Sequence, residues 1–157
     1  MAEYDSRLDM VHRLRALTLQ LDLLGAEFAQ EHGLHPTDLR ALIGLLDRER
    51  AGELATPGWL AEHLRLNTAS VTALVDRLEK AGHVQRDRDS KDRRRVILRV
   101  TPAAEKLGWD FFGPLIAQAS DALETFSAAR LDAVRDFLVA MTAAVESARS
   151  RQQDTEH

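Results

Sequence analysis

The sequence predicts a mainly helical protein with one small β-hairpin, and three observations support this fold class. Apolar residues recur at gaps of three and four over the first and last thirds of the chain, as in amphipathic helices. Between residues 84 and 100 the pattern changes to the alternation of a half-buried strand. Helix start and stop signals, such as Thr56-Pro57 and Gly82, punctuate the segment before the hairpin. Long terminal helices therefore flank a compact central segment.

The first helix is expected from about residue 5 to residue 30. Its apolar positions follow a seven-residue repeat, with members Met10, Leu14, Leu17, Leu21, Leu24 and Phe28. Gly33 closes this helix and His35-Pro36 opens the second. The inward side of the second helix is expected to carry Leu39, Leu42, Ile43 and Leu46.

Two short helices joined by a tight turn are expected next. Thr56 and Asn67 are the candidate N-caps, and Pro57 suits a first helical position. The second of these helices buries a stripe made of Val71, Leu74, Val75 and Leu78. Its other face carries small, hydroxylated or charged side chains: Ala69, Ser70, Thr72, Ala73, Asp76, Arg77 and Lys80.

A charged hairpin follows Gly82. Val96, Leu98 and Val100 alternate along its second strand, and a polar tip extends from Asp87 to Arg94. Helix, turn, helix and charged hairpin together describe a winged helix-turn-helix. Its second helix fits a DNA major groove, and an arginine-rich tip suits the adjoining minor groove.

Two further helices are expected after the hairpin, and they carry seven-residue repeats. The members are Phe112, Ile116, Ala119, Leu123 and Phe126 in one, and Leu131, Val134, Leu138, Met141 and Val145 in the other, which Ser127 caps. One copy has difficulty covering all these stripes, so the terminal helices are predicted to interlock with a second copy as a homodimer. An ordinary intramolecular bundle is the alternative. The predicted segments are an N-terminal dimerisation helix (1–35), a winged helix-turn-helix DNA-binding domain (36–101), C-terminal dimerisation helices (102–150) and a frayed tail (151–157).

Charge is distributed unevenly along the chain. All 157 residues together carry a formal net charge of −4, yet from Arg65 to Arg99 ten Lys or Arg accompany five Asp or Glu. That segment is +5 and the remainder −9. A basic segment on an acidic body is the footprint of a DNA-binding protein. A solvated surface hairpin is the alternative for the charge pattern alone.

Composition and missing motifs exclude other classes of function. The absence of cysteine removes disulfides, zinc sites with thiolate ligands and thiol-based redox switches. The six histidines lack the spacing of a helical zinc site, and there is neither a glycine-rich phosphate loop nor a G-x-S-x-G elbow. We therefore expect no enzymatic activity, no metal and no cofactor. Without a secretory signal or a run of roughly 20 apolar residues, a cytoplasmic location and no membrane partner are expected.

The central motif resembles the multiple-antibiotic-resistance regulator (MarR) family. The matching pattern is L-A-x-x-L-x-L-x-x-x-x-V-T-x-L-V-D-R-L-E-x-x-G-x-V-x-R from Leu60 to Arg86, then D-x-x-D-R-R-x-V-x-L-x-x-T from Asp89 to Thr101. This resemblance implies a dimeric bacterial transcription regulator, acting as a repressor, that binds a pseudo-palindromic double-stranded DNA operator and releases it on binding a small ligand. The sequence departs from the family at Ala73, where members often carry a long polar side chain.

Candidate DNA-binding residues lie on the second short helix and on the hairpin. The helix offers Thr68, Ala69, Ser70, Thr72, Ala73 and Arg77, and the hairpin offers Arg86, Arg88, Lys91, Asp92, Arg93 and Arg94. The hydroxyls of Ser70 and Thr72 are expected at base edges or phosphates, and Arg77 at the DNA backbone.

The resemblance places one hairpin arginine in the minor groove. We assign this role to Arg94, with Asp92 holding its side chain, and expect Arg93 to pair with Asp76. In the alternative interpretation, all the hairpin arginines make interchangeable phosphate contacts. A second alternative is a winged-helix protein-interaction module that docks an acidic protein surface and does not bind DNA sequence-specifically.

The resemblance also implies an effector pocket bounded by the first, second and fifth helices. The candidate residues are Phe28, His32, His35, Trp59, Trp109 and Phe112, which suit a small aromatic or phenolic effector. Packing within the core explains the same residues equally well.

Overall fold

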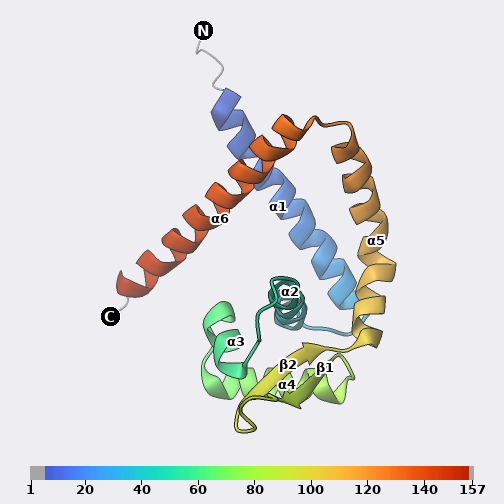
Figure 1. Ribbon diagram of the computed structural model, residues 1–157, viewed down its shortest axis with the longest axis vertical. Coiled ribbons are helices and arrows are strands. Elements are labelled where there is room, and N and C mark those ends of the chain that lie inside the picture. Colours follow the sequence, from blue (N-terminus) through green and yellow to red (C-terminus); the bar gives the residue numbers. More distant parts are fainter. Residues whose placement is uncertain (1–5, 156–157) are drawn as a thin grey trace. The chain divides into compact units, whose positions relative to one another are not determined.

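The computed structural model describes residues 6–155 as six helices and one two-stranded sheet (Figure 1). The predicted mainly helical fold with one β-hairpin is confirmed. The chain forms two compact units, Met1–Phe111 and Phe112–His157. Residues 1–5 of the expected N-terminal segment and 156–157 of the expected tail lie outside the described residues.

The first unit begins with α1 (Ser6–Glu31) and α2 (Pro36–Arg50). Between them Gly33 takes a positive φ of 65°, and the Leu34 N–H donates to the Ala29 carbonyl at 2.8 Å. This left-handed residue ends α1 in the way that glycine allows at least cost. The start of α2 is held by Asp38, whose carboxylate accepts the His35 backbone N–H at 3.1 Å.

Two capped helices follow, α3 (Pro57–Leu64) and α4 (Thr68–Lys80). The Thr56 hydroxyl accepts the Trp59 N–H at 3.1 Å, and the Asn67 side chain accepts the Ser70 N–H at 2.8 Å. Both predicted N-caps are therefore confirmed. The turn between the helices contains a feature that the sequence did not indicate, because Arg65 takes a left-handed conformation with φ 55°.

The hairpin pairs β1 (Val84–Arg88) with β2 (Val96–Val100), and Val84 lies opposite Val100. It contacts α4, as Figure 1 shows, and the Leu98 N–H donates to the Ala55 carbonyl at 2.8 Å. The hairpin is thus anchored both to the helix and to the segment that precedes α3.

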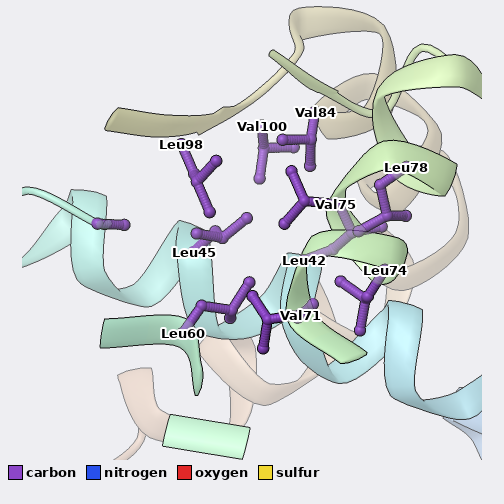
Figure 2. Close-up of a cluster of buried hydrophobic side chains, with 12 residues drawn as sticks. Leu42, Leu45, Leu60, Val71, Leu74, Val75, Leu78, Val84, Leu98 and Val100 are labelled. Carbon is purple, nitrogen blue, oxygen red and sulfur yellow. The ribbon is translucent and has the colours of Figure 1, made fainter. Parts of the chain in front are cut away.

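One hydrophobic core joins α2, α3, α4 and the hairpin (Figure 2). The predicted stripe of α4 is fully buried in it, together with Leu60, Val84, Leu98 and Val100. The prediction for α2 was wrong at Ile43, which is 46% exposed. Leu39 and Leu42 are buried as predicted, and Leu46 is partly buried against the core. The buried face of α2 also takes in residues that the prediction left out: Asp38, Ala41, Gly44 and Leu45.

Helix α5 (Pro102–Glu124) continues through Pro114 and crosses from the first unit into the second. The second unit also contains α6 (Ala128–Thr155), which extends into the segment expected to be a frayed tail. Its start is capped as predicted, because the Ser127 hydroxyl accepts the Arg130 N–H at 3.4 Å. Several apolar side chains of α6 are exposed in the isolated chain, among them Leu138 and Val139 at 50% and 64%. Among the described residues, no helix is both long and apolar enough to span a bilayer.

Candidate nucleic-acid interface

The first two turns of α4 present a surface of small side chains. Opposite the buried stripe, the candidate residues Thr68, Ala69, Ser70, Thr72 and Ala73 are all exposed. Ala69 and Ala73 are one helical turn apart and lie farthest from the core by the helical period. With only a methyl group at each, the helix backbone is able to approach another surface closely.

The hydroxyl of Thr72 is already partly used. It donates to the Thr68 carbonyl at 2.9 Å, within α4. A hydroxyl has one hydrogen, so Thr72 can still offer an outside partner its methyl group and an acceptor lone pair. Ser70 uses its backbone N–H on the Asn67 cap, which leaves its side-chain hydroxyl on the exposed surface.

Arg77 is bound to a buried carboxylate on α2. Its Nη2 lies 2.5 Å from Asp38 Oδ1, and its Nε lies 3.2 Å from Asp38 Oδ2. The side-chain hydrogen bond that Arg77 donates to Asp38 is the largest influence on the guanidinium and raises the pKa of Arg77, so the group remains charged. Sequence reasoning missed Asp38, although its place three residues after the N-cap His35 fits a capping-box position.

Arg86 fixes the first strand of the hairpin to α4. Its guanidinium pairs with Asp76 at 2.5 Å and also with Glu79, and its side chain is largely covered. Burial acts to lower the pKa of Arg86, but the hydrogen bonds that it donates to both carboxylates and their negative charges outweigh this effect, and the net shift of the pKa is upward. The expected pairing of Asp76 with Arg93 was wrong: Asp76 pairs with Arg86 of β1, whereas Arg93 lies between the strands, in the tip of the hairpin.

The tip of the hairpin is shaped by two aspartates. Asp89 is buried and accepts the Lys91 backbone N–H at 2.9 Å, and Asp92 accepts the Arg94 backbone N–H at 3.0 Å. Asp92 was expected to hold the Arg94 side chain, and its carboxylate holds the Arg94 main chain instead. Such side-chain to backbone bonds fix a turn locally.

The basic residues of the tip fall into two groups. Arg88 donates to the Arg93 carbonyl at 3.0 Å, and Arg95 lies 3.8 Å from Asp89, so both support the turn itself. At the tip, Lys91, Arg93 and Arg94 are exposed. For these last three, the described part of the chain supplies no carboxylate partner within ion-pair distance.

A further arginine, which sequence reasoning did not single out, secures the base of the hairpin. Arg99 on β2 pairs with Asp87 on β1 at 3.1 Å and with Glu49 on α2 at 3.0 Å. The cross-strand position of Asp87 could have indicated the first pair, but Glu49 is 50 residues away in sequence. Strand, strand and helix are therefore linked through one guanidinium.

Only part of the expected effector pocket is found in one cluster. The ring of Phe28 lies 4.3 Å from that of His32 and 5.0 Å from that of Phe111, a residue absent from the candidate set. His32 Nδ1 lies 2.9 Å from the Phe28 carbonyl.

The other candidate residues lie elsewhere. Trp59 belongs to another stack, with the ring of His63 at 4.8 Å and the guanidinium of Arg48 at 4.6 Å. His35 is the N-cap of α2, Trp109 is 60% exposed, and Phe112 belongs to the second unit. Across residues 6–155 no three His, Asp or Glu side chains group as metal ligands would.

Comparison with known proteins agrees with this geometry. A sequence profile of the MarR family matches residues 32–95. The HTH-type transcriptional regulator YcgE of Bacillus subtilis, itself uncharacterised, is 39% identical over 128 residues, which are 82% of this chain and 80% of YcgE. The chain belongs to the MarR family. It is thus a transcriptional regulator, as the central motif predicted.

Solved structures of this family share its fold. A mutant form of MepR from a multidrug-resistant S. aureus clinical isolate has a TM-score of 0.69 at 17% identity, and the alignment covers 92% of this chain and 99% of that one. MepR of S. aureus in its DNA complex has a TM-score of 0.55 at 16% identity, with 86% and 98% covered. At this identity the likeness concerns the fold alone.

Proposed function

We propose that this MarR-family regulator binds a pseudo-palindromic operator in double-stranded DNA as a homodimer. In this proposal α4 enters the major groove, the hairpin tip reaches the minor groove, and the protein acts in the cytoplasm as a repressor that a small ligand releases. One observation carries the proposal. The exposed, small-residue start of α4 lies on the same winged unit as a tip with three basic side chains that the described part of the protein does not pair.

The chemistry of α4 supports contact with base edges. Recognition helices contact bases through residues near their N-termini, and here these residues are Ala69, Ser70, Thr72 and Ala73. Methyl groups suit the C5-methyl of thymine, and hydroxyls suit donors or acceptors at any base edge. No long side chain separates this part of the helix from the groove.

The tip supports minor-groove contact. Arginine is favoured in a narrow minor groove because its guanidinium is weakly hydrated and the negative potential there is enhanced. Arg94 remains our candidate for insertion, with Lys91 and Arg93 at adjacent phosphates. We reassign Asp92 to shaping the turn and Arg86 to holding the hairpin on α4, because those are the contacts that their side chains make.

Exposed apolar side chains support a homodimer. They recur along α1, at Met10, Leu17 and Leu21, and along α6, at Leu138 and Val145. Monomeric soluble proteins rarely leave such extended apolar surface in water. A dimer with twofold symmetry would present two copies of α4, which matches a palindromic site.

For the effector we propose a small aromatic or phenolic molecule at the cluster of Phe28, His32 and Phe111. Aromatic edges would contact its ring, and a histidine at the margin would orient a polar group. We propose that the protein acts by binding and not by catalysis.

The alternative of a protein-interaction module is separated from this proposal by a DNA-binding measurement. Genomic fragments retained by the purified protein would be sequenced and then tested by mobility shift against a mixed-sequence duplex of equal length. We expect at least about 1,000-fold preference for the selected fragments at physiological salt. Equal affinity for selected and mixed-sequence DNA would refute operator recognition.

A further inference from the structure

We infer that Asp38 is a positioning residue for DNA binding, which holds one edge of the Arg77 guanidinium so that the other edge meets a DNA phosphate. This inference rests on the proposed DNA binding. It assigns a role to a buried carboxylate on α2, outside both α4 and the hairpin.

The environment of Asp38 is unusual for a carboxylate. Its residue is only 1% exposed and lies on the buried face of α2. Both of its oxygens are used, since Oδ1 accepts from Arg77 Nη2 at 2.5 Å and Oδ2 accepts from Arg77 Nε and from the His35 N–H. A charge that is removed from water in this way requires paired partners. The pair is therefore fixed in geometry at the Asp38 end.

The Arg77 end of the pair is open. Nε and Nη2 form one edge of the planar guanidinium, and they face Asp38. The adjacent edge carries Nη1 and the second N–H of Nη2. The described residues supply no acceptor for Nη1, and the Arg77 side chain is 46% exposed. Guanidinium groups bind phosphate oxygens in a planar, bidentate manner, and an arginine that is already oriented loses less side-chain freedom on binding.

The position of Arg77 on α4 also fits a phosphate. Ser70 and Arg77 are seven residues apart and share one side of the helix, at a separation of about 10.5 Å along its axis. The major groove is about 12 Å wide. With the start of α4 at the base edges, Arg77 is at the right distance for the wall of the groove, where the phosphates lie. The neighbouring carboxylates Asp76 and Glu79 both pair with Arg86, which lowers their combined charge from −2 to −1 and so weakens their repulsion of DNA there.

A substitution of Asp38 distinguishes a positioning role from a purely electrostatic one, because the two roles predict opposite changes in DNA affinity. Asp38→Asn keeps an oxygen that can accept the His35 N–H, and it removes one negative charge. If only total charge mattered, the variant would bind DNA more tightly. If Arg77 needs its partner to be aimed, the variant would bind more weakly although it retains the arginine.

The test uses the full-length protein and a mixed-sequence duplex of about 30 base pairs, since phosphate contacts do not depend on the operator. Affinity would be measured by fluorescence anisotropy between about 50 and 200 mM salt, where counterion release gives a slope of about one per phosphate contact. The variants are D38N, R77K and the double variant D38N/R77Q, which removes both charges together. The matched control is D47N, since Asp47 is an exposed carboxylate on the same helix that pairs with Arg50.

We expect D38N to bind about tenfold more weakly than the wild type, within about twofold of D38N/R77Q, and with a salt slope lower by about one per subunit. D47N should bind as tightly as the wild type or slightly more tightly. R77K keeps the charge and the Asp38 cap but lacks the planar edge, and it should also bind more weakly.

Several outcomes would overturn the inference. Wild-type affinity and slope in folded D38N, or tighter binding by it, would show that Arg77 acts without Asp38. If D38N fails to fold by circular dichroism, R77K decides, and wild-type binding by R77K would refute the need for an aimed guanidinium. Absence of DNA binding by the wild-type protein itself would instead refute the proposed function, so the two failures are distinguishable.

Discussion

The proposed homodimer is open to a direct test at Leu138 of α6. This residue belongs to the seven-residue repeat and is 50% exposed in the isolated chain. Full burial of a leucine side chain contributes about 1.5–3 kcal/mol, so burying the exposed half contributes about 1 kcal/mol in each subunit. Twofold symmetry doubles this to about 2 kcal/mol, which is about 30-fold in the dissociation constant of the dimer. We expect that loss from Leu138→Ala.

Leu138→Glu should have a much larger effect, because it would place an unpaired charge in the interface from each subunit. The matched control is Val139→Glu at the neighbouring position, which is 64% exposed and lies outside the repeat. Analytical ultracentrifugation over a range of protein concentrations would measure the dimer dissociation constant of each variant. A wild-type protein that sediments as a folded monomer at micromolar concentration, or an L138E variant as dimeric as V139E, would refute the reasoning.

Three other predictions concern α4 and the hairpin. Thr72→Ala should weaken operator binding by about 1–3 kcal/mol. Thr72→Val should weaken it by less, because valine keeps the methyl group and the hydroxyl hydrogen of Thr72 is already donated to the Thr68 carbonyl. Equal losses on operator and mixed-sequence DNA would contradict base contact. Arg94→Lys should reduce the preference for A·T-rich over G·C-rich flanks in competition assays, and an unchanged ratio would exclude minor-groove insertion. Arg86→Gln should lower the free energy of unfolding by about 1–2 kcal/mol. Because the pKa of Arg86 is raised, its contribution is fully present below the ordinary arginine pKa, so the difference in denaturant midpoint should be constant between about pH 6 and pH 9.

The features that the sequence predicted well are set by short-range chemistry. Thr56 and Asn67 each bond a backbone N–H three residues later, so the caps of α3 and α4 require no knowledge of the rest of the fold. The buried stripe of α4 is similarly visible as a helical period. The left-handed Arg65 was missed because a non-glycine residue at positive φ gives no compositional signal.

The long-range ion pairs could not be predicted from spacing. Asp38 and Arg77 are 39 residues apart, and Arg99 and Glu49 are 50 apart. The error at Ile43 has the same origin. The buried face of α2 includes the carboxylate of Asp38, and a search for apolar residues at helical spacing passes over that residue and selects Ile43 instead. Asp38 can be buried only because Arg77 on α4 pairs with its carboxylate, and this partner cannot be read from the sequence of α2.

The predicted site also includes arginines whose guanidinium groups already bind other parts of the protein. From sequence alone, every arginine between residues 77 and 94 was a candidate for DNA contact, because the exposure and pairing of these side chains are not visible in the sequence. The structure divides them by what their guanidinium groups already bind. Arg86 takes carboxylates of α4, and Arg88 takes a carbonyl of its own turn. The arginines of this segment are therefore not interchangeable.

This division gives the basic segment two physical roles that its net charge of +5 conceals. Arginines near the foot of the hairpin are paired with carboxylates from α2, α4 and β1, and these pairs determine where the hairpin lies relative to α4. At the tip, Lys91, Arg93 and Arg94 have no carboxylate partner in the described part of the chain, so their side chains can pair with a DNA phosphate. Recognition of DNA needs both, since an arginine discriminates between sites only if the element that carries it is held at a fixed distance from the recognition helix. Removing an ion pair such as Arg86–Asp76 should thus reduce specificity even though it frees a charge.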